Sequence, residues 1–282
     1  MAIRVALIGP GRMGQVVARN FLKHPLVKLV LVASRPGSEK VGKDLGEILD
    51  LPPTGLVVQS SEHLGEALGA TRPDMIIDFT TPEASLRNLK IAAKHGVHLI
   101  VGTTGYTRFQ LEALRSYAEM YRVSLVMATN LSIGINVLMH AARKMASILG
   151  GFDVEIIEEH HRYKKDAPSG TALRLAQTVA REIDVNPEKG FVYGRHGNKK
   201  RDQKEIAIHA VRGGGTVGVH KIIFISDNER LEITHESLNR NAFTDCLVRV
   251  LEYVYLHPPG IYTVEEVLGL EPPEEVVEEE VS

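Results

Sequence analysis

The sequence is poor in cysteine, in net charge and in long apolar runs. Cys246 is the single cysteine among 282 residues, which excludes an intrachain disulfide framework and a zinc site built from several thiolates. No apolar run reaches the roughly 20 residues that a membrane-spanning helix needs. The chain runs from Met1 directly into a glycine-containing turn, which predicts no signal peptide. Together these absences favour a protein of the reducing cytoplasm.

The charge balance also excludes some partners. The formal net charge is −2, too weak a bias for a nucleic-acid-binding surface. With 44% hydrophobic residues the chain can bury a real core, so whole-chain disorder is excluded. Residues 271–282 contain six glutamates and neither Lys nor Arg, which predicts a disordered acidic tail. The rest of the chain is then mildly cationic and suits an anionic small molecule.

The first half alternates short apolar runs with helical patterns. Strands are expected over residues 4–8, 27–33, 75–79, 97–101 and 123–127. Helices are expected over residues 13–23, 83–95 and 109–121. Such alternation is typical of βαβ units and predicts a Rossmann-type, doubly wound parallel sheet. We expect this α/β dinucleotide-binding domain to span residues 1–130.

The second half predicts an α+β domain over residues 131–240, which would bind substrate and form oligomers. Helices are expected over residues 135–149 and 171–183, with a strand at 154–158 between them. Residues 191–203 are basic and contain glycine, which indicates a loop. Strands at 205–211, 217–226 and 230–235 are expected to form an antiparallel sheet, with a tight hairpin near residues 227–228. A last helix, within residues 241–257, closes the fold.

The first candidate site is a glycine loop. Gly9, Gly11 and Gly14 give the pattern G-x-G-x-x-G between a predicted strand and a predicted helix. Glycines there permit a tight turn and let backbone N–H groups approach a pyrophosphate at the helix N-terminus. The alternative is a glycine turn that only packs a helix on a strand. The position favours nucleotide binding.

The residues after the second strand bear on the choice of cofactor. An enzyme selective for NAD usually has an Asp or Glu there, which holds the ribose 2′-hydroxyl. Ser34 and Arg35 occupy that place here, and Arg12 lies in the glycine loop. A guanidinium matches a phosphate, so the sequence favours NADPH, with NADH possible. Alternatively, Arg35 is an exposed turn residue.

Two further segments follow predicted strands and belong to the same sheet edge. They are residues 102–105, Gly-Thr-Thr-Gly, and residues 128–131, Ala-Thr-Asn-Leu. Open α/β sheets bind ligands at the carboxyl ends of their strands. Ordinary strand-to-helix turns are the alternative, but the shared position favours a role in binding.

The densest chemistry lies in residues 158–171, with two histidines, several cations and then Ser-Gly-Thr before a helix. The free N–H groups of a helix N-terminus bind anions, and a histidine can supply a proton alongside a hydride. Alternatively, Ser169 is only a helix cap, and Asp166 only neutralises lysines. A metal site is disfavoured because no third ligand follows His160 and His161 at a suitable spacing. Together these residues favour an oxidoreductase site.

The run from His160 to Ala172 resembles the signature of the 4-hydroxy-tetrahydrodipicolinate reductase (dihydrodipicolinate reductase) family. The resemblance extends over nearly the whole chain, in blocks at residues 11–14, 78–80, 102–105, 130–132, 211–220 and 230–235. It implies an enzyme of diaminopimelate and lysine biosynthesis that reduces a cyclic dicarboxylate with NADPH or NADH. It also implies a cytoplasmic homotetramer whose C-terminal helix returns to the nucleotide domain.

The resemblance implies roles for individual residues. The catalytic residues would be His160, as the general acid, and Lys164. Substrate contacts would come from His161, Ser169, Gly170 and Thr171. Cofactor contacts would come from Gly9, Pro10, Gly11, Arg12, Met13, Ser34, Arg35, Phe79, Gly102, Thr103, Thr104, Ala128, Thr129, Asn130 and Leu131.

Two other functions stay open from the sequence. One is a related NAD(P)-dependent dehydrogenase acting on another small substrate, against which the Ser-Gly-Thr anion site argues. The other is a non-catalytic protein that senses NADPH, which the presence of both His160 and Lys164 disfavours.

Overall fold

The computed structural model describes residues 2–128 and 130–270, and the chain forms two compact units. Of the described residues, the first unit holds those up to Ser132 together with Phe243–Leu270, and the second holds Ile133–Ala242. The expected acidic tail, residues 271–282, lies outside the described residues. Within the described ranges, every helix is too short or too polar to cross a membrane.

The first unit is built on a seven-stranded sheet in which every neighbouring pair of strands is parallel. The order across the sheet is β12-β6-β5-β4-β1-β2-β3. The strands are β1 (Ile3–Ile8), β2 (Val27–Ser34), β3 (Gln59–Ser60), β4 (Met75–Asp78), β5 (His98–Val101), β6 (Leu125–Met127) and β12 (Ile261–Tyr262). The order reverses between β1 and β4, so the predicted doubly wound sheet is confirmed. Ligands bind such sheets at this reversal, beside the carboxyl ends of the strands.

Helices cover both faces of this sheet. They are α1 (Arg12–Phe21), α2 (Leu45–Ile48), α3 (Leu64–Thr71), α4 (Pro82–Lys94), α5 (Arg108–Tyr121), α9 (Ala242–Leu256) and α10 (Val264–Val267). Ala6 and Ile8 of β1 belong to one apolar cluster with residues of α3, α4 and α5. Val5 and Leu7 point to the opposite face and are equally buried, while α1 packs on β1 and β2. Burial on both faces explains why β1 is apolar from Val5 to Ile8.

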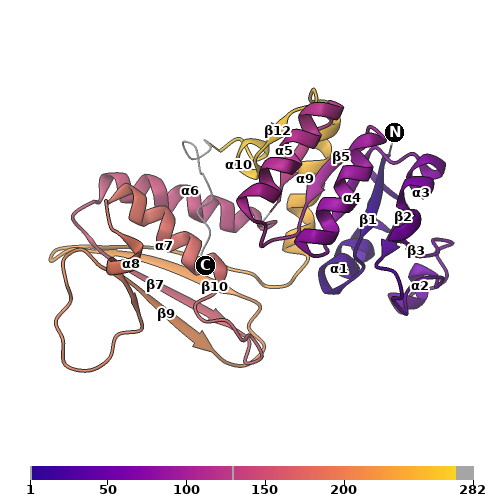
Figure 1. The fold of residues 1–282 in the computed structure, drawn as a ribbon. Coiled ribbons are helices and arrows are strands. Elements are labelled where there is room, and N and C mark those ends of the chain that lie inside the picture. Colours follow the sequence, from indigo (N-terminus) through magenta and orange to yellow (C-terminus); the bar gives the residue numbers. More distant parts are fainter. Residues whose placement is uncertain (1, 129, 271–282) are drawn as a thin grey trace. The chain divides into compact units, whose positions relative to one another are not determined.

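The chain returns to the first unit at its C-terminal end. Figure 1 shows the yellow segment with α9, β12 and α10 beside α5 and β5. The short strand β12 adds to the sheet next to β6. Asn20 of α1 donates from Nδ2 to Oγ1 of Thr244 in α9, at 3.2 Å. The helix expected within residues 241–257, α9, therefore lies in the same unit as the glycine loop.

The second unit pairs two long helices with a five-stranded sheet of order β11-β10-β7-β9-β8. The strands are β7 (Asp153–His160), β8 (Phe191–Tyr193), β9 (Ile206–Arg212), β10 (Val219–Ile225) and β11 (Arg230–Glu236). The helices are α6 (Ile133–Ile148), α7 (Gly170–Glu182) and the short α8 (Pro187–Gly190). The predicted hairpin is confirmed, since Ile225 pairs with Arg230 and the Ser226 N–H donates to the Glu229 carbonyl.

Two expectations about this sheet are wrong. The three late strands do not form a simple antiparallel sheet, because β7 lies between β9 and β10 and runs parallel to β9. The connection from β7 passes through α7, which brings the chain back in the same direction, as a helical crossover does. Residues 191–193, expected in a loop, form β8 instead and pair in parallel with β9.

Strand β7 alternates between its two faces. Val154, Ile156 and Glu158 are buried, whereas Glu155 and Ile157 are only partly so. Val154 and Ile156 pack in the cluster formed with α6 and α7. Because side chains on a strand alternate with a period of two, Glu158 points to the same helix-covered face. A carboxylate there needs partners, and these partners form the centre of the candidate site.

Candidate active site

The glycine loop connects β1 to α1. Gly9 has a φ of +87°, and a Cβ placed on it would overlap the carbonyl oxygen of Phe79. A Cβ on Gly14 would likewise overlap the carbonyl oxygen of Gly9. Gly11 caps α1 with no side chain at its N–H groups. The loop therefore leaves a backbone cradle at a helix N-terminus, which fits the pyrophosphate of a dinucleotide cofactor.

A buried carboxylate organises the neighbouring strand ends. Asp78, at the end of β4, accepts from the backbone N–H and the hydroxyl of Thr80, at 3.0 and 2.6 Å. It also accepts from Thr103 Oγ1 at 2.9 Å and from Asn88 Nδ2 at 2.9 Å. The structure thus brings together the turns that contain the predicted residues Phe79 and Thr103.

The other predicted cofactor residues of this edge have varied surroundings. Gly102 donates its N–H to the Asp78 carbonyl, and Ala128 donates to the Val101 carbonyl. Thr104 is exposed and Leu131 is buried. Asn130 accepts from the Ser132 N–H at 3.0 Å. Thr129 lies outside the described residues.

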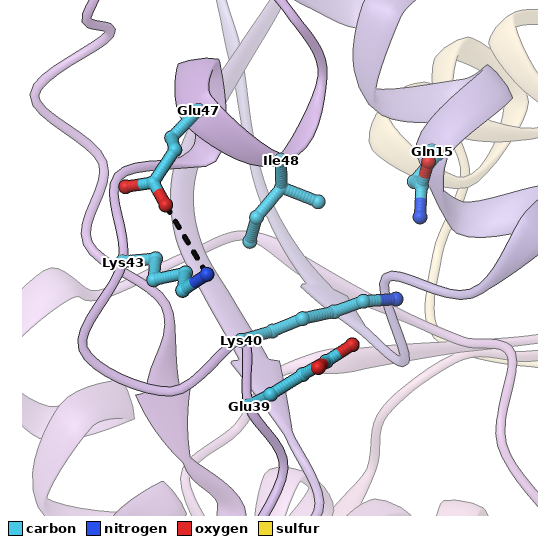
Figure 2. A pocket seen from close by; sticks show the side chains of 6 residues that line it. All are labelled: Gln15, Glu39, Lys40, Lys43, Glu47 and Ile48. Atoms are coloured by element: carbon cyan, nitrogen blue, oxygen red, sulfur yellow. Dashed lines mark ion pairs between the residues drawn. The ribbon is translucent and has the colours of Figure 1, made fainter.

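A hollow beside the glycine loop was not predicted. It has a volume of about 230 Å³ and is lined by Gln15, Glu39, Lys40, Lys43, Glu47 and Ile48. Figure 2 shows Lys40 extended across the hollow toward Gln15, with Lys43 turned to Glu47 at 3.2 Å. Lys40 Nζ donates to the Pro10 carbonyl at 2.6 Å. The sequence signal was available, because two lysines follow the end of β2 closely.

The residues predicted to select the cofactor lie near this segment of the chain. Ser34 ends β2 and is 7% exposed, so its small side chain faces the interior. Arg35 and Arg12 are exposed, and neither forms an ion pair within residues 2–128 and 130–270. Both guanidinium groups are thus open to an anion.

The catalytic candidates of the second unit gather at the end of β7. His160 Nδ1 lies 2.5 Å from Oε2 of Glu158, a side chain with no exposed surface. Arg212 of β9 donates from both terminal nitrogens to the same carboxylate, at 2.8 and 2.6 Å. The backbone N–H of Ser169 donates to Oε1 at 2.9 Å. Sequence reasoning missed the roles of Glu158 and Arg212.

The loop after β7 carries the other candidates. Lys164 Nζ lies 2.7 Å from Oδ2 of Asp166, an exposed carboxylate whose pKa this lysine lowers. Arg212 also donates to the Asp166 backbone carbonyl at 2.7 Å, which joins this loop to Glu158. The Nδ1 atom of His161 is buried without a partner among the described residues. Such an atom is available to a ligand.

The N-terminus of α7 has the form of an anion site. Ser169 caps the helix, because its hydroxyl accepts from the Ala172 N–H at 3.2 Å. The N–H groups of Gly170 and Thr171 have no acceptor in the described part of the chain. The Ser169 hydroxyl also lies 3.2 Å from Nε2 of His220. Ser169 is therefore a helix cap, as the alternative interpretation predicted. The turn that it caps also leaves two N–H groups, those of Gly170 and Thr171, without an acceptor among the described residues.

The titratable groups of this cluster shift in ways that suit proton transfer. Burial lowers the pKa of His160, as do the nearby Lys164 and Arg212 cations, whereas Glu158 raises it. Burial raises the pKa of Glu158, but the hydrogen bonds from Arg212, His160 and Ser169 outweigh this and leave it lowered. Burial lowers the pKa of His220 to about 4. The cluster thus holds an ionised carboxylate between a cation and a neutral imidazole.

The cofactor candidates lie in the first unit, and the substrate candidates lie in the second. Across the described ranges, no three His, Cys, Asp or Glu side chains are placed to hold a metal ion. The first unit therefore carries a backbone cradle at a helix N-terminus, and the second carries a histidine, a lysine and a second helix N-terminus with free N–H groups.

Comparison with known proteins identifies the family. Residues 3–131 match the family described as dihydrodipicolinate reductase, N-terminus, and residues 134–268 match its C-terminus. The chain belongs to the dihydrodipicolinate reductase family. It is an oxidoreductase by family, and the family's dinucleotide-binding fold implies use of NADH or NADPH.

Individual relatives are similar to this chain over almost their full lengths. The chain is 40% identical over 270 residues to the 4-hydroxy-tetrahydrodipicolinate reductase of Methanocaldococcus jannaschii, covering 95% of this chain and 98% of that one. The Myxococcus xanthus enzyme of that name is also 40% identical, with the same coverage. Dipicolinate-bound dihydrodipicolinate reductase from Paenisporosarcina sp. TG-14 superimposes with a TM-score of 0.76, 29% identity and coverage of 94% and 99%.

A more distant structure shares the fold alone. Amine dehydrogenase from Mycobacterium smegmatis gives a TM-score of 0.63 at 17% identity, covering 94% of this chain and 96% of that one. The family resemblance of the signature at residues 160–172 is confirmed by these matches.

Proposed function

We propose that this protein reduces 4-hydroxy-tetrahydrodipicolinate to tetrahydrodipicolinate with NADPH, a step of diaminopimelate and lysine biosynthesis. The support is the family membership together with one feature of the second unit. There, a histidine with a free ring nitrogen lies with a lysine and with the unpaired N–H groups of a helix N-terminus. A cyclic dicarboxylate that must accept a proton matches these groups.

The reaction consumes one NADPH and one proton and releases one water. Loss of water from the hydroxylated ring gives dihydrodipicolinate. The nicotinamide, when bound, supplies a hydride to C4 of that ring. His160 then supplies the proton that the resulting ring anion needs, and Lys164 stabilises its negative charge.

The substrate carboxylates need fixed cations and N–H donors. We assign one carboxylate to the N–H groups of Gly170 and Thr171, which have no partner among the described residues and lie at the positive end of α7. Ser169 supports this cradle by capping the helix. His161 and Lys164 bind the other carboxylate, because His161 has a buried free Nδ1 and Lys164 carries a charge.

The first unit would serve as the cofactor domain. Its predicted contacts run along one sheet edge, from the glycine loop to residues 102–104 and 128–131. The preference for NADPH is supported by the absence of a carboxylate at Ser34 and by the open guanidinium groups of Arg35 and Arg12. Lys40 and Lys43 add two cations in the hollow beside Pro10, where a 2′-phosphate would find charge-assisted donors. Glu39, also in that hollow, opposes this preference.

We also propose that the uncovered face of the second sheet joins copies into a homotetramer. That face carries Ile157, which is partly exposed, and Val211, which is 47% exposed. Apolar side chains on an open sheet face favour association. Light scattering on the purified protein would give the mass of four chains, and a monomer mass would contradict this.

The experiment is an optical assay of NADPH oxidation. The substrate is generated in the cuvette from pyruvate and aspartate semialdehyde by its synthase, and NADH is tested in parallel. We expect oxidation that depends on both precursors and is faster with NADPH. Equal rates with NADH would keep the reduction but contradict the preference.

Two outcomes would favour other functions. Cofactor binding without oxidation, in a folded protein, would point to the sensor. Oxidation that requires a different carbonyl or imine substrate would point to a related dehydrogenase.

A further inference from the structure

The buried carboxylate of Glu158 has four hydrogen-bond donors. They are His160 Nδ1 at 2.5 Å, Ser169 N at 2.9 Å, and the two terminal nitrogens of Arg212 at 2.8 and 2.6 Å. An ionised carboxylate has about four acceptor positions, so this one is saturated. Its side chain has no exposed surface and therefore no water to replace a lost partner. The carboxylate is fixed in place.

These donors come from three parts of the site. His160 is the next residue on the same face of β7, Arg212 lies on β9, and Ser169 caps α7. The side chain therefore joins the proposed proton donor to the proposed carboxylate cradle. If the only role of Glu158 were to pair with Arg212, the contacts with His160 and with the Ser169 N–H would not be needed.

The contact with His160 also decides which ring nitrogen holds a proton. Glu158 is ionised and can only accept, so Nδ1 must be the donor. This leaves Nε2 of His160, which has no hydrogen-bond partner within the described residues. Nε2 points toward Gly218, where an added Cβ would lie only 3.1 Å away. Because residue 218 is glycine, Nε2 has space beside it that a larger side chain at that position would fill.

We propose that Glu158 is a positioning residue: it holds the Nδ1 proton of His160, so that Nε2 is the atom that exchanges the catalytic proton, and it fixes the N-terminus of α7 in register with that atom. This inference rests on the proposed function in assigning the proton to catalysis. Glu158 itself does not touch the substrate.

The charges around His160 make the proposal testable. Among the described residues, Glu158 is the anion in contact with the ring, whereas Lys164 from the loop and Arg212 from β9 are cations. His220 of β10 meets the ring edge-on with 5.2 Å between centroids and is neutral near pH 7. Asp166 is a step further away, bound to Lys164. Removing Glu158 or Arg212 should therefore shift the His160 titration in opposite directions.

The test is a nitrogen-15 NMR titration of the histidine rings in the folded full-length protein, with His160 assigned by its absence in H160Q. In the wild type above the His160 pKa, we expect a neutral ring with its proton on Nδ1; below that pKa, Nε2 carries a second proton, taken from solvent, which is the one donated in the reaction. In E158Q, we expect its pKa to fall by about one unit or more, the size of the effect of an adjacent opposite charge. In R212Q, we expect the pKa to rise. If the His160 pKa moved in the same direction in both variants, or in neither, the proposal would be overturned.

The chain offers a matched control on the same strand. Glu155 lies on the other face of β7, where it binds His209 Nε2 at 2.6 Å and pairs with Arg195 and Arg201. E155Q removes a comparable ion-paired carboxylate next to a different histidine. We expect it to leave the His160 titration unchanged. A shift in E155Q as large as in E158Q would show that the effect is general and would contradict the proposal.

A second variant covers the case in which E158Q does not fold. E158D keeps the charge on a side chain one methylene shorter, so the Nδ1-protonated ring and a near-normal pH profile of kcat/KM should return in part. In E158Q, the alkaline fall of kcat/KM should begin about one pH unit lower than in the wild type. A folded E158D without recovery in either readout would overturn the proposal.

These readouts separate the inference from the proposed function. The NMR titration needs no turnover, so a wild-type chain that does not reduce the substrate would contradict the proposed function alone. An active wild type in which E158Q leaves the His160 titration unmoved would contradict the positioning role alone.

Discussion

Each of the two units buries a carboxylate completely, and the two carboxylates differ in their hydrogen-bond partners. Asp78 of the first unit has neutral partners, namely the hydroxyls of two threonines, an amide and a backbone N–H. Glu158 of the second unit has a guanidinium, an imidazole and a backbone N–H. Both satisfy the requirement that buried polar groups find partners.

The different partners indicate different roles, one structural and one connected with proton transfer. None of the partners of Asp78 titrates near neutral pH, so its network fixes the turns of the cofactor edge and responds little to pH. Glu158 contacts a histidine whose protonation changes during the proposed reaction. Disrupting the first network should mainly change stability, whereas disrupting the second should change proton transfer.

The largest effect should come from the reactive groups that Glu158 serves. H160Q removes the proton donor but keeps a polar side chain of similar size. We expect turnover to fall by about 10²–10⁴-fold with little change in substrate KM, since general acid catalysis contributes about this much. K164A should lower turnover and weaken substrate binding as well. The measurement is steady-state NADPH oxidation.

The neighbouring Lys165 supplies the control, because it is exposed and one position further along the loop. K165A should leave kcat and KM within about twofold of the wild type, as an exposed side chain away from such contacts does. Full activity in both H160Q and K164A would contradict the assignment of this site.

Next in size is an acid sensitivity of the second unit. Burial lowers the pKa of His220 to about 4 in the folded chain, against an ordinary value of 6.5. Between these pH values the unfolded chain binds the extra proton, so the free energy of unfolding should fall as pH drops from 6.5 to 4. For this group the loss is on the order of 3 kcal/mol, since each pKa unit corresponds to about 1.4 kcal/mol.

Urea unfolding at pH 7.5 and pH 4.5 measures this loss. H220N should lose less stability across that interval than the wild type, because it no longer takes up this proton on unfolding. Replacing the exposed His196 with Asn is the control and should reproduce the wild-type difference. An unchanged difference in H220N would contradict the burial account of this histidine.

A smaller effect should follow from breaking the Asp78 network. D78N replaces one acceptor oxygen with an NH₂ group that faces donors from Thr80, Thr103 or Asn88. We expect the free energy of unfolding to fall by about 1–3 kcal/mol, the cost of leaving a buried polar group unsatisfied. The position of the alkaline fall in kcat/KM should not move, in contrast to E158Q.

Thermal or urea unfolding and a pH–rate profile measure both properties. The exposed turn residue Asp227 gives a matched control, and D227N should change neither. A shift of the pH profile in D78N as large as that in E158Q would remove the distinction between the two carboxylates.

The smallest effect concerns the lysines of the hollow. In the double variant K40M/K43M, we expect the preference for NADPH over NADH to fall by up to about tenfold, since a charged hydrogen bond of about 1.5 kcal/mol corresponds to that factor and these side chains are partly exposed. E39Q should change the ratio in the opposite direction. The measurement is kcat/KM with NADPH divided by kcat/KM with NADH. If this ratio were unchanged in K40M/K43M, a role for these lysines would be contradicted.

The sequence predicted most of the first unit because its signals are local. The apolar run of β1, the glycines after it and the amphipathic α1 are adjacent, and each needs only its neighbours to be recognised. The pairing of β9 with β7 could not be found in this way, since it depends on where α7 returns the chain. Strands as short as β8 and β12 also give too little pattern.

The candidate site was predicted only in part for a related reason. His160 and Lys164 stand out by residue type. Glu158 and Glu159 look alike in sequence, and only the alternation of Val154 and Ile156 with their neighbours indicates which glutamate points inward. Arg212 could not be connected with Glu158 before the pairing of β9 with β7 was known.

The central claim, hydride transfer to a cyclic dicarboxylate, is tested most directly by isotope transfer. NADPH carrying deuterium in place of both hydrogens at C4 of the nicotinamide is supplied to the chain with the substrate generated in place. The account predicts a tetrahydrodipicolinate that is one mass unit heavier, with the deuterium on C4 of the ring. Oxidation of the labelled cofactor with no deuterium in the product, or no oxidation by the folded protein, would contradict it.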